Sequence, residues 1–387
     1  MKSKFSKIID QIPPSGIREF FDLVAQSDDV ISLGVGEPDF VTPWHIRAEA
    51  IYSLENGQTS YTSNKGLPEC RQEIANYMDR RFGCCYDADE EIIVTVGVSE
   101  AIDIALRAIL NPGDEVIVPE PTFVCYAPLV QLAGGTVRSL DTSKTDFIPD
   151  IKALEKAITK NTKAIILCSP NNPTGRVIPK KILQGIADLA EKHDFWVISD
   201  EVYAELTYDK SFVSFGALKK MKARTILLNG FSKAFAMTGW RLGFLCAPAD
   251  LTSRALKIHQ YAMMCASITA QYAAIDALKN GQSEVEDMRD SYLQRRNLCV
   301  HRFNEMGLDL VAPEGAFYCF PSIRKTGLSS KEFATKLLKS ERVAVVPGSA
   351  FGLGGEGHIR CCYATNLKDL EIALQRVAHF TGSIRSA

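Results

Sequence analysis

Short hydrophobic runs alternate with amphipathic stretches through the middle of the chain. The runs Lys163–Ser169 and Phe195–Asp200 are apolar almost throughout, which is typical of strands covered on both faces. Four further runs predict strands, at Glu91–Val98, Glu115–Pro119, Arg224–Asn229 and Gly243–Ala247. Helical spacing separates these runs, at Ser99–Leu110, Ile151–Ile158, Lys180–His193 and Leu251–Leu278. The alternation predicts an α/β fold with a mainly parallel sheet and helices on both faces.

The pattern changes from about Gly281 onward. It predicts a long charged helix, a β-hairpin, a further helix, a short strand and a final helix, at Glu284–Met306, Leu308–Pro321, Lys331–Lys339, Val343–Pro347 and from Leu367. At 387 residues the chain is long for one core, so two domains are expected. We predict a large domain at 45–283 and a smaller α+β domain made of 1–44 and 284–387.

Charge and composition exclude several classes of protein. Hydrophobic residues make up 46% and charged residues 23%, and the net charge is −2 without a long block of either sign. A nucleic-acid-binding surface would need a basic stripe. No apolar run is long enough to span a membrane, and none follows Met1–Pro14 as in a secretory signal. The eleven cysteines include no C-x-x-C pair, so we expect free thiols, no metal site and a cytoplasmic location.

Ligands of open α/β sheets bind beyond the carboxyl ends of the strands, so the residues that follow each strand are candidates for chemistry. Lys233 lies amid apolar neighbours after Arg224–Asn229, and Arg241 follows eight positions later. A lysine forms a Schiff base only as a free amine, and partial burial with nearby positive charge favours that form. The alternative is a surface lysine beside a turn.

Asp200 ends the strand that begins at Phe195, and Tyr203 follows it. A carboxylate here could keep a pyridine nitrogen protonated, and the tyrosine could donate to a ring oxygen. An N-cap aspartate that opens a helix is the alternative.

Two turns next to strands could hold polar groups. The turn Ser169–Gly175 contains two prolines and a glycine, which would hold Asn172 rigidly, although Asn-Pro turns are common without function. Gly97–Ala101 joins a strand to a helix, and such a helix N-terminus binds anions. Ser99 could add a hydroxyl there or serve as an N-cap. Neither turn is a G-x-G-x-x-G or P-loop motif, which argues against a dinucleotide or nucleoside triphosphate site.

Two more side chains suit a flat, carboxylated ligand. Phe123 could stack on a heteroaromatic ring, or it could be a core residue. Arg360 could clamp a carboxylate through paired N–H bonds, or it could form a surface ion pair.

With these residues assembled, the chain resembles the class I/II aminotransferases, the aspartate aminotransferase-like family of pyridoxal 5′-phosphate (PLP) enzymes. The likeness extends from Ser32–Phe40 to the segment around Arg360, and it is greatest to the bacterial and archaeal subgroup that acts on aspartate or aromatic amino acids. The resemblance implies the PLP-dependent transferase fold, with a mainly parallel seven-stranded sheet and a smaller α+β domain.

The resemblance also implies roles around the ring of the cofactor. Lys233 matches the Schiff-base lysine that also moves the substrate proton, and Asp200 matches the partner of the pyridine nitrogen. Asn172 and Tyr203 match the ligands of the ring hydroxyl oxygen, and Phe123 matches the stacking aromatic residue. Lys233, Asp200 and Tyr203 are therefore the implied catalytic residues.

Phosphate and substrate contacts are implied in the same way. Val98, Ser99 and Arg241 match the phosphate ligands of the family. Arg360 matches the clamp on the substrate α-carboxylate, and Gly36 matches the backbone contact opposite it. Asn172 is expected to contact the substrate too.

One position matches a contact between subunits, and another departs from the family. Tyr61 matches a tyrosine that reaches the phosphate of the neighbouring subunit, which implies a homodimer with shared active sites. Some relatives have a serine three residues before the lysine, where this chain has Gly230. Ser232 could replace that phosphate contact.

The expected reaction is a ping-pong transfer of an amino group from an L-amino acid to a 2-oxo acid such as 2-oxoglutarate. The main alternative is a PLP-dependent C–S β-lyase or another lyase on the same scaffold. A transcription regulator with an aminotransferase-like domain would need a DNA-binding extension, for which Met1–Asp29 is too short. A nicotinamide dehydrogenase would need the missing glycine motif and would leave Lys233 unexplained.

Overall fold

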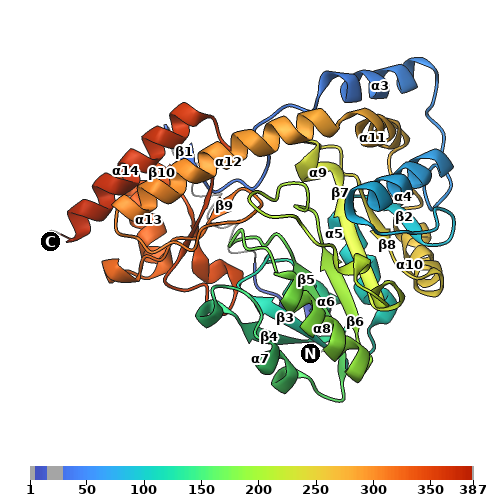
Figure 1. The fold of residues 1–387 in the computed structure, drawn as a ribbon, viewed down its shortest axis with the longest axis horizontal. Coiled ribbons are helices and arrows are strands. Elements are labelled where there is room, and N and C mark those ends of the chain that lie inside the picture. Colours follow the sequence, from blue (N-terminus) through green and yellow to red (C-terminus); the bar gives the residue numbers. More distant parts are fainter. Residues whose placement is uncertain (1–4, 15–28, 386–387) are drawn as a thin grey trace.

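A seven-stranded sheet forms the centre of the computed structural model, which describes residues 5–14 and 29–385 (Figure 1). In spatial order its strands are β2 (Ile92–Thr95), β8 (Gly243–Cys246), β7 (Thr225–Gly230), β6 (Trp196–Asp200), β5 (Thr162–Cys168), β3 (Glu115–Glu120) and β4 (Thr136–Asp141). β8 is antiparallel to β2 and β7, and the other neighbouring pairs are parallel. The predicted mainly parallel seven-stranded sheet is thus confirmed.

Apolar side chains on successive strand positions pack into different layers. Ile165 and Leu167 on β5 pack in one cluster with Leu183, whereas Ile166 packs in another with Ile104. Because strand side chains alternate between faces, an uninterrupted apolar run predicts a sheet that is covered on both sides. The helices of this part of the chain are α3 (Trp44–Glu55), α4 (Pro68–Phe82), α5 (Val98–Ile109), α6 (Tyr126–Leu132), α7 (Ile151–Ala157), α8 (Lys180–His193), α9 (Phe231–Ala234), α10 (Ala249–Ala262) and α11 (Ile268–Asn280).

The C-terminal part contains two small sheets and three longer helices. β1 (Ile31–Ser32) pairs in parallel with β10 (Val343–Ala344), and β12 (Ile359–Cys362) lies between β11 (Val346–Pro347) and β9 (Tyr318–Cys319). The helices are α12 (Gln282–Glu305), α13 (Ser330–Glu341) and α14 (Leu367–Arg385), and α1 (Lys7–Gln11) is a short helix near the N-terminus. Leu33 shares a hydrophobic cluster with residues of α12, α13 and α14. The N-terminal segment that contains β1 therefore packs with the C-terminal elements.

Several predicted elements differ from the structure. The helix predicted at Leu251–Leu278 is wrong as one element, because Met264 has a φ of 66° and the chain bends between α10 and α11. Ser267 then caps α11 by accepting a hydrogen bond from the backbone N–H of Ala270. The β-hairpin predicted at Leu308–Pro321 is also wrong, since that range contributes β9, whose partner is β12.

Two further differences concern strands. The strand predicted at Val343–Pro347 is divided between two sheets as β10 and β11, and β4 was not predicted from its pattern. Only Leu140 of β4 is buried, so the strand lacks an apolar run. The long charged helix, the helix near Lys331 and the final helix are found as α12, α13 and α14. The domain division at residues 45 and 283 stays a prediction, and part of its N-terminal segment lies outside the described residues.

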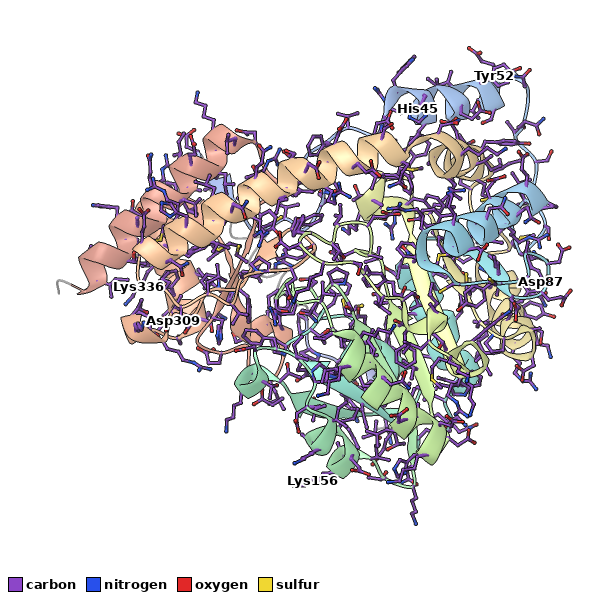
Figure 2. The ribbon with its side chains drawn as sticks, viewed as in Figure 1. His45, Tyr52, Asp87, Lys156, Asp309 and Lys336 are labelled. Atoms are coloured by element: carbon purple, nitrogen blue, oxygen red, sulfur yellow. The ribbon has the colours of Figure 1, made fainter. Side chains whose placement is uncertain are left out.

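Figure 2 shows the side chains on this framework, with Tyr52 on the outer side of α3 and Asp309 among the C-terminal elements. Within the described ranges, the chain forms no helix that is both long and apolar enough to cross a membrane.

Candidate functional site

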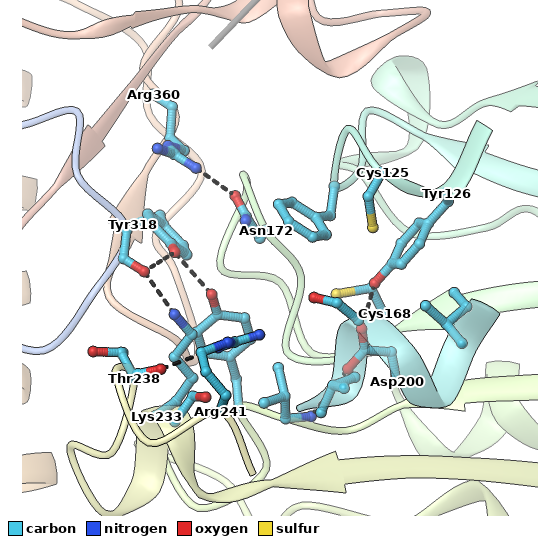
Figure 3. A pocket seen from close by; sticks show the side chains of 18 residues that line it. Cys125, Tyr126, Cys168, Asn172, Asp200, Lys233, Thr238, Arg241, Tyr318 and Arg360 are labelled. Carbon is cyan, nitrogen blue, oxygen red and sulfur yellow. Dashed lines mark hydrogen bonds between the residues drawn. The ribbon is translucent and has the colours of Figure 1, made fainter. Parts of the chain in front are cut away.

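A cavity of about 270 Å³ lies where the loops after β2, β3, β5, β6 and β7 meet the C-terminal elements (Figure 3). Its walls carry charged, polar and aromatic side chains from segments far apart in the sequence. The lining residues are Gly36, Val98, Ser99, Ile102, Phe123, Cys125, Tyr126, Cys168, Asn172, Asp200, Val202, Tyr203, Ser232, Lys233, Thr238, Arg241, Tyr318 and Arg360. All the predicted site residues except Tyr61 are therefore brought together.

Lys233 is held in α9, the short helix directly after β7. Its Nζ donates a hydrogen bond to the carbonyl oxygen of Gly36 at 2.7 Å. Burial lowers the pKa of Lys233 to about 8, and the positive charges of Arg360 and Arg241 act in the same direction. A larger fraction of the amine is thus free near neutral pH than in an exposed lysine, and the partly buried position in the cavity wall excludes a surface lysine beside a turn.

Asp200 is the last residue of β6, and its side chain is buried. Oδ2 accepts a hydrogen bond from the Tyr126 hydroxyl at 2.7 Å, and Oδ1 accepts one from the backbone N–H of Val202 at 3.2 Å. Burial raises the pKa of Asp200, while these two donors and the charge of Lys233 oppose the change. A buried carboxylate on a cavity wall is suited to a cationic ligand atom, which would offset the cost of desolvation.

Backbone N–H groups and an arginine form one end of the cavity. Helix α5 begins at Val98, and Gly97 precedes it at a φ of 76°. A methyl group at Gly97 would lie 2.7 Å from Nη2 of Arg241, so glycine is needed here to leave room for the guanidinium. Arg241 itself has a φ of 55°, a backbone conformation that costs a side-chain-bearing residue about 1–2 kcal/mol. A helix N-terminus beside an arginine is suited to an anion.

The packing around Gly230, the position that departs from the family pattern, leaves little room for a side chain. A side-chain carbon here would meet Cα of Gly243 at 3.0 Å and the carbonyl oxygen of Leu242 at 3.1 Å. Ser232 lines the cavity instead. Its use as a phosphate contact stays a prediction.

Arg360 projects from β12 and is buried, with 3% of its surface exposed. Nη1 donates to Oδ1 of Asn172 at 3.0 Å, and Nη2 donates to the carbonyl oxygen of Gly34 at 2.5 Å. Nε has no hydrogen-bond partner among the residues that the structure describes. A buried guanidinium with donor capacity to spare on a cavity wall is suited to a carboxylate, and the burial excludes a surface ion pair.

Neither Ser99 nor Asp200 acts as a helix cap. Gly97 takes the N-cap position before α5, and a turn rather than a helix follows β6. Both residues line the cavity. The capping roles considered for them are therefore wrong, and both residues face the space that a ligand would occupy.

The aromatic residues Phe123 and Tyr61 occupy different environments. Phe123 packs at the edge of the core, with its ring centroid 5.9 Å from that of Tyr126, and it also lines the cavity. It is thus both a core residue and a wall of the site. Tyr61 lies outside the cavity of its own chain and is 79% exposed.

Sequence reasoning missed several lining residues. Tyr126 is the donor to Asp200, and its position three residues after Phe123 could have suggested a shared wall. Tyr318 and Thr238 carry no local signal of their own. Cys125 and Cys168 complete the wall near Asp200, and burial raises the pKa of both thiols above the usual value.

Comparisons with known proteins agree with this arrangement. The family "Aminotransferase class I and II" matches residues 28–377, which include every lining residue of the cavity. A putative aminotransferase of Bacillus subtilis, YugH, is 57% identical, covering 98% of this chain and 99% of its own length. The aspartate aminotransferase of Pyrococcus abyssi is 48% identical, covering 95% and 96%. The crystal structure of an aromatic aminotransferase from Pyrococcus horikoshii is similar at a TM-score of 0.91 and 46% identity, covering 96% of this chain and 100% of that one.

Proposed function

The chain belongs to the class I and II aminotransferases, a PLP-dependent family, and on this premise we propose that it transfers the amino group of aspartate or an aromatic L-amino acid to a 2-oxo acid such as 2-oxoglutarate. The observation that carries the proposal is the meeting of Lys233, Asp200 and Arg360 in one cavity. These three groups supply a free amine, a buried carboxylate and a carboxylate clamp.

The residues of the cavity fit PLP. The buried carboxylate of Asp200 suits a protonated ring nitrogen, and the N-terminus of α5 at Val98, beside Arg241, suits a phosphate. Asn172 and Tyr203 are the candidates for the ring hydroxyl oxygen, and Phe123 is the candidate for a stacking contact. When bound, PLP supplies an aldehyde that takes up an amino group and a ring that accepts electrons from the substrate Cα.

The proposed roles of the side chains follow from their positions. The free amine of Lys233 takes the proton from the substrate Cα and later returns a proton. Asp200 keeps the ring nitrogen protonated by its negative charge. Arg360 orients the substrate through its α-carboxylate, and the same clamp serves both half-reactions because amino acids and 2-oxo acids share that group.

The cavity wall bears on the choice of amino acid. Among the described lining residues the cationic side chains are Lys233, Arg241 and Arg360. Arg241 is proposed to bind the phosphate and Arg360 the α-carboxylate. Among the described lining residues, no arginine is therefore left for a second carboxylate on the substrate side chain. An aromatic side chain needs no such partner, so a panel that includes aspartate, phenylalanine and tyrosine separates the two groups of donors.

We infer a homodimer that shares its active sites. Large hydrophobic side chains are exposed just before and on α3, at Tyr61, and around the bend between α10 and α11. They are Val41, Trp44, Tyr52, Tyr61, Tyr261, Met263 and Met264. The segments are neighbours, because Asn64 donates to the carbonyl oxygen of Met264 and α3 packs on α11. Exposed apolar surface of this extent supports a protein interface. All eleven cysteines are free thiols, which supports the proposed cytoplasmic location.

The direct test is glutamate formation from 2-oxoglutarate with each of a panel of L-amino acids. Glutamate with aspartate or an aromatic amino acid, and the matching oxo acid as second product, is the expected result. Absence of amino-group transfer from every donor, to 2-oxoglutarate or to another 2-oxo acid, together with pyruvate and ammonia release from a C–S substrate such as cystathionine, would replace the proposal by a C–S lyase function.

A further inference from the structure

The tyrosine at position 318 contacts three of the predicted site residues, although no motif points to it. It lies on β9 and is buried, with 1% of its surface exposed. Its ring lies under Arg360, with 4.7 Å between the guanidinium carbon and the ring centroid. Its hydroxyl is 2.8 Å from the hydroxyl of Tyr203 and 3.5 Å from the carbonyl oxygen of Gly36 (Figure 3).

Gly36 has to be glycine for this arrangement to exist. A methyl group there would lie 2.5 Å from the Tyr318 hydroxyl oxygen, which is closer than any normal contact. The Gly36 carbonyl is also the acceptor for Nζ of Lys233 at 2.7 Å. A continuous chain of contacts therefore runs from the Lys233 amine through the Gly36 carbonyl and the Tyr318 hydroxyl to the Tyr203 hydroxyl.

Each tyrosine hydroxyl has one proton to donate, so the directions of these bonds depend on one another. The Gly36 carbonyl oxygen has two lone pairs and can accept from both Nζ of Lys233 at 2.7 Å and the Tyr318 hydroxyl at 3.5 Å. The 3.5 Å contact is long for an O–H···O bond and the Tyr203 hydroxyl lies at 2.8 Å, so the Tyr318 proton favours Tyr203 while Lys233 holds the carbonyl, and Tyr203 then donates into the cavity. When the lysine nitrogen leaves the carbonyl, Tyr318 can turn its proton to Gly36. Tyr203 can then donate to Tyr318. Burial raises the pKa of both tyrosines, so both keep their protons near neutral pH.

We propose that Tyr318 is a positioning residue that couples the location of the Lys233 amine to the direction in which Tyr203 offers its proton, while its ring supports Arg360. The inference rests on the proposed function, since it assigns Tyr203 a partner in the cavity. The proposal assigns separate roles to two parts of the Tyr318 side chain. The hydroxyl directs the proton of Tyr203, and the ring face supports Arg360 in binding the substrate carboxylate.

The test compares Tyr318→Phe, which removes the hydroxyl, with Tyr318→Leu, which also removes the ring. Tyr318→Met is the reserve if the leucine variant does not fold, because methionine fills irregular space. Tyr363→Phe is the matched control, since the Tyr363 hydroxyl is equally buried but bonds to Tyr208 and Ala316 away from the cavity.

Three quantities are measured on the cofactor-loaded protein. They are kcat, the pH midpoint of the cofactor absorbance, and the Kd of a carboxylate without an amino group, either 3-phenylpropionate or maleate according to the donor found. For Tyr318→Phe we expect kcat to fall about 3- to 10-fold and the absorbance midpoint to move by about half a pH unit or more, with an unchanged Kd. For Tyr318→Leu we expect the Kd to rise by about 10- to 30-fold as well.

Two negative outcomes are distinguishable. A wild-type protein that neither takes up PLP nor binds either carboxylate contradicts the proposed function itself. A wild-type protein that does both, with a phenylalanine variant whose kcat and absorbance midpoint match it, contradicts the role of Tyr318 alone. An equal effect in Tyr363→Phe would also overturn the inference, because it would show a general loss of packing.

Discussion

Nζ of Lys233 lies 2.7 Å from the carbonyl oxygen of Gly36, a residue 197 positions earlier in the chain. The contact joins the end of the large sheet to the N-terminal loop that follows β1. It is one of several contacts across the cavity, with the bonds of Arg360 to Asn172 and to the Gly34 carbonyl. Four segments distant in sequence thus meet at Lys233 and Arg360, two of the three groups on which the proposed reaction depends.

The first prediction concerns the stability of the cofactor-free protein. Because burial holds the folded-state pKa of Lys233 at about 8, below its ordinary value of 10.5, the folded protein loses this proton at a lower pH than the unfolded chain. Its stability relative to a Lys233→Met variant should therefore rise between about pH 8 and 10.5, by at most about 3 kcal/mol. Below pH 8 the cost of the buried charge is fully present. Urea unfolding of both proteins at pH 7.5 and pH 10 measures the difference, and a gap that stays constant would show that the lysine is not desolvated.

The second prediction concerns Asp200. Asparagine keeps the shape but lacks the negative charge: its Oδ1 can accept from the backbone N–H of Val202, and its Nδ2 can donate to the Tyr126 hydroxyl oxygen. We expect Asp200→Asn to lower kcat by about 100-fold or more. The cofactor-free variant should unfold at the same temperature as the wild type or higher, because a desolvated charge has been removed.

Asp194→Asn is the matched control for that variant, since Asp194 is an exposed carboxylate paired with Arg224. Its kcat should equal that of the wild type. Near-normal turnover in Asp200→Asn would remove the proposed role of this carboxylate, whatever the thermal measurements show.

The third prediction concerns Arg360. Lysine keeps the charge but cannot offer paired N–H groups to a carboxylate. We expect Arg360→Lys to lower kcat/KM for the amino acid by about 100-fold, while PLP stays bound. Arg296→Lys is the control, because Arg296 is also buried against a tyrosine ring but lies outside the cavity. Steady-state kinetics and the PLP absorbance of both variants decide the outcome, and equal losses in the two would count against a substrate clamp.

The fourth prediction concerns the proposed shared active sites. Lys233→Ala and Tyr61→Ala subunits should each be impaired as homodimers. If Tyr61 serves the neighbouring subunit, a heterodimer of one Lys233→Ala subunit and one Tyr61→Ala subunit has one active site with both substitutions and one active site with neither. Mixing the two variants should therefore restore activity. Co-purification with two different affinity tags isolates the heterodimer for assay. Activity no higher than that of the Tyr61→Ala homodimer would show that Tyr61 acts within its own chain or not at all.

The sequence by itself determined the sheet and most of the cavity. Uninterrupted apolar runs such as Ala164–Leu167 specify strands covered on both faces, and the residues after those strands supplied Asp200, Asn172 and Lys233. These features are local: strand period, burial on both faces and the polar residue at a strand end all appear within ten positions. The pattern did not predict strand β4, because this strand lies at the edge of the sheet with one buried residue, Leu140, and therefore has no apolar run.

Tertiary structure decided the rest. The bend at Met264 and the position of Tyr318 between Tyr203 and Arg360 have no counterpart in local pattern. The spacing of Phe123 and Tyr126 could suggest a shared wall, but not the bond from Tyr126 to Asp200. The lowered pKa of Lys233 likewise arises mainly from burial by the groups that surround it in space, with smaller contributions from the charges of Arg360 and Arg241. Hydrophobic periodicity records which side of an element is buried but not what it is buried against, because that depends on how separate elements pack. The chemistry of the cavity depends on those neighbours.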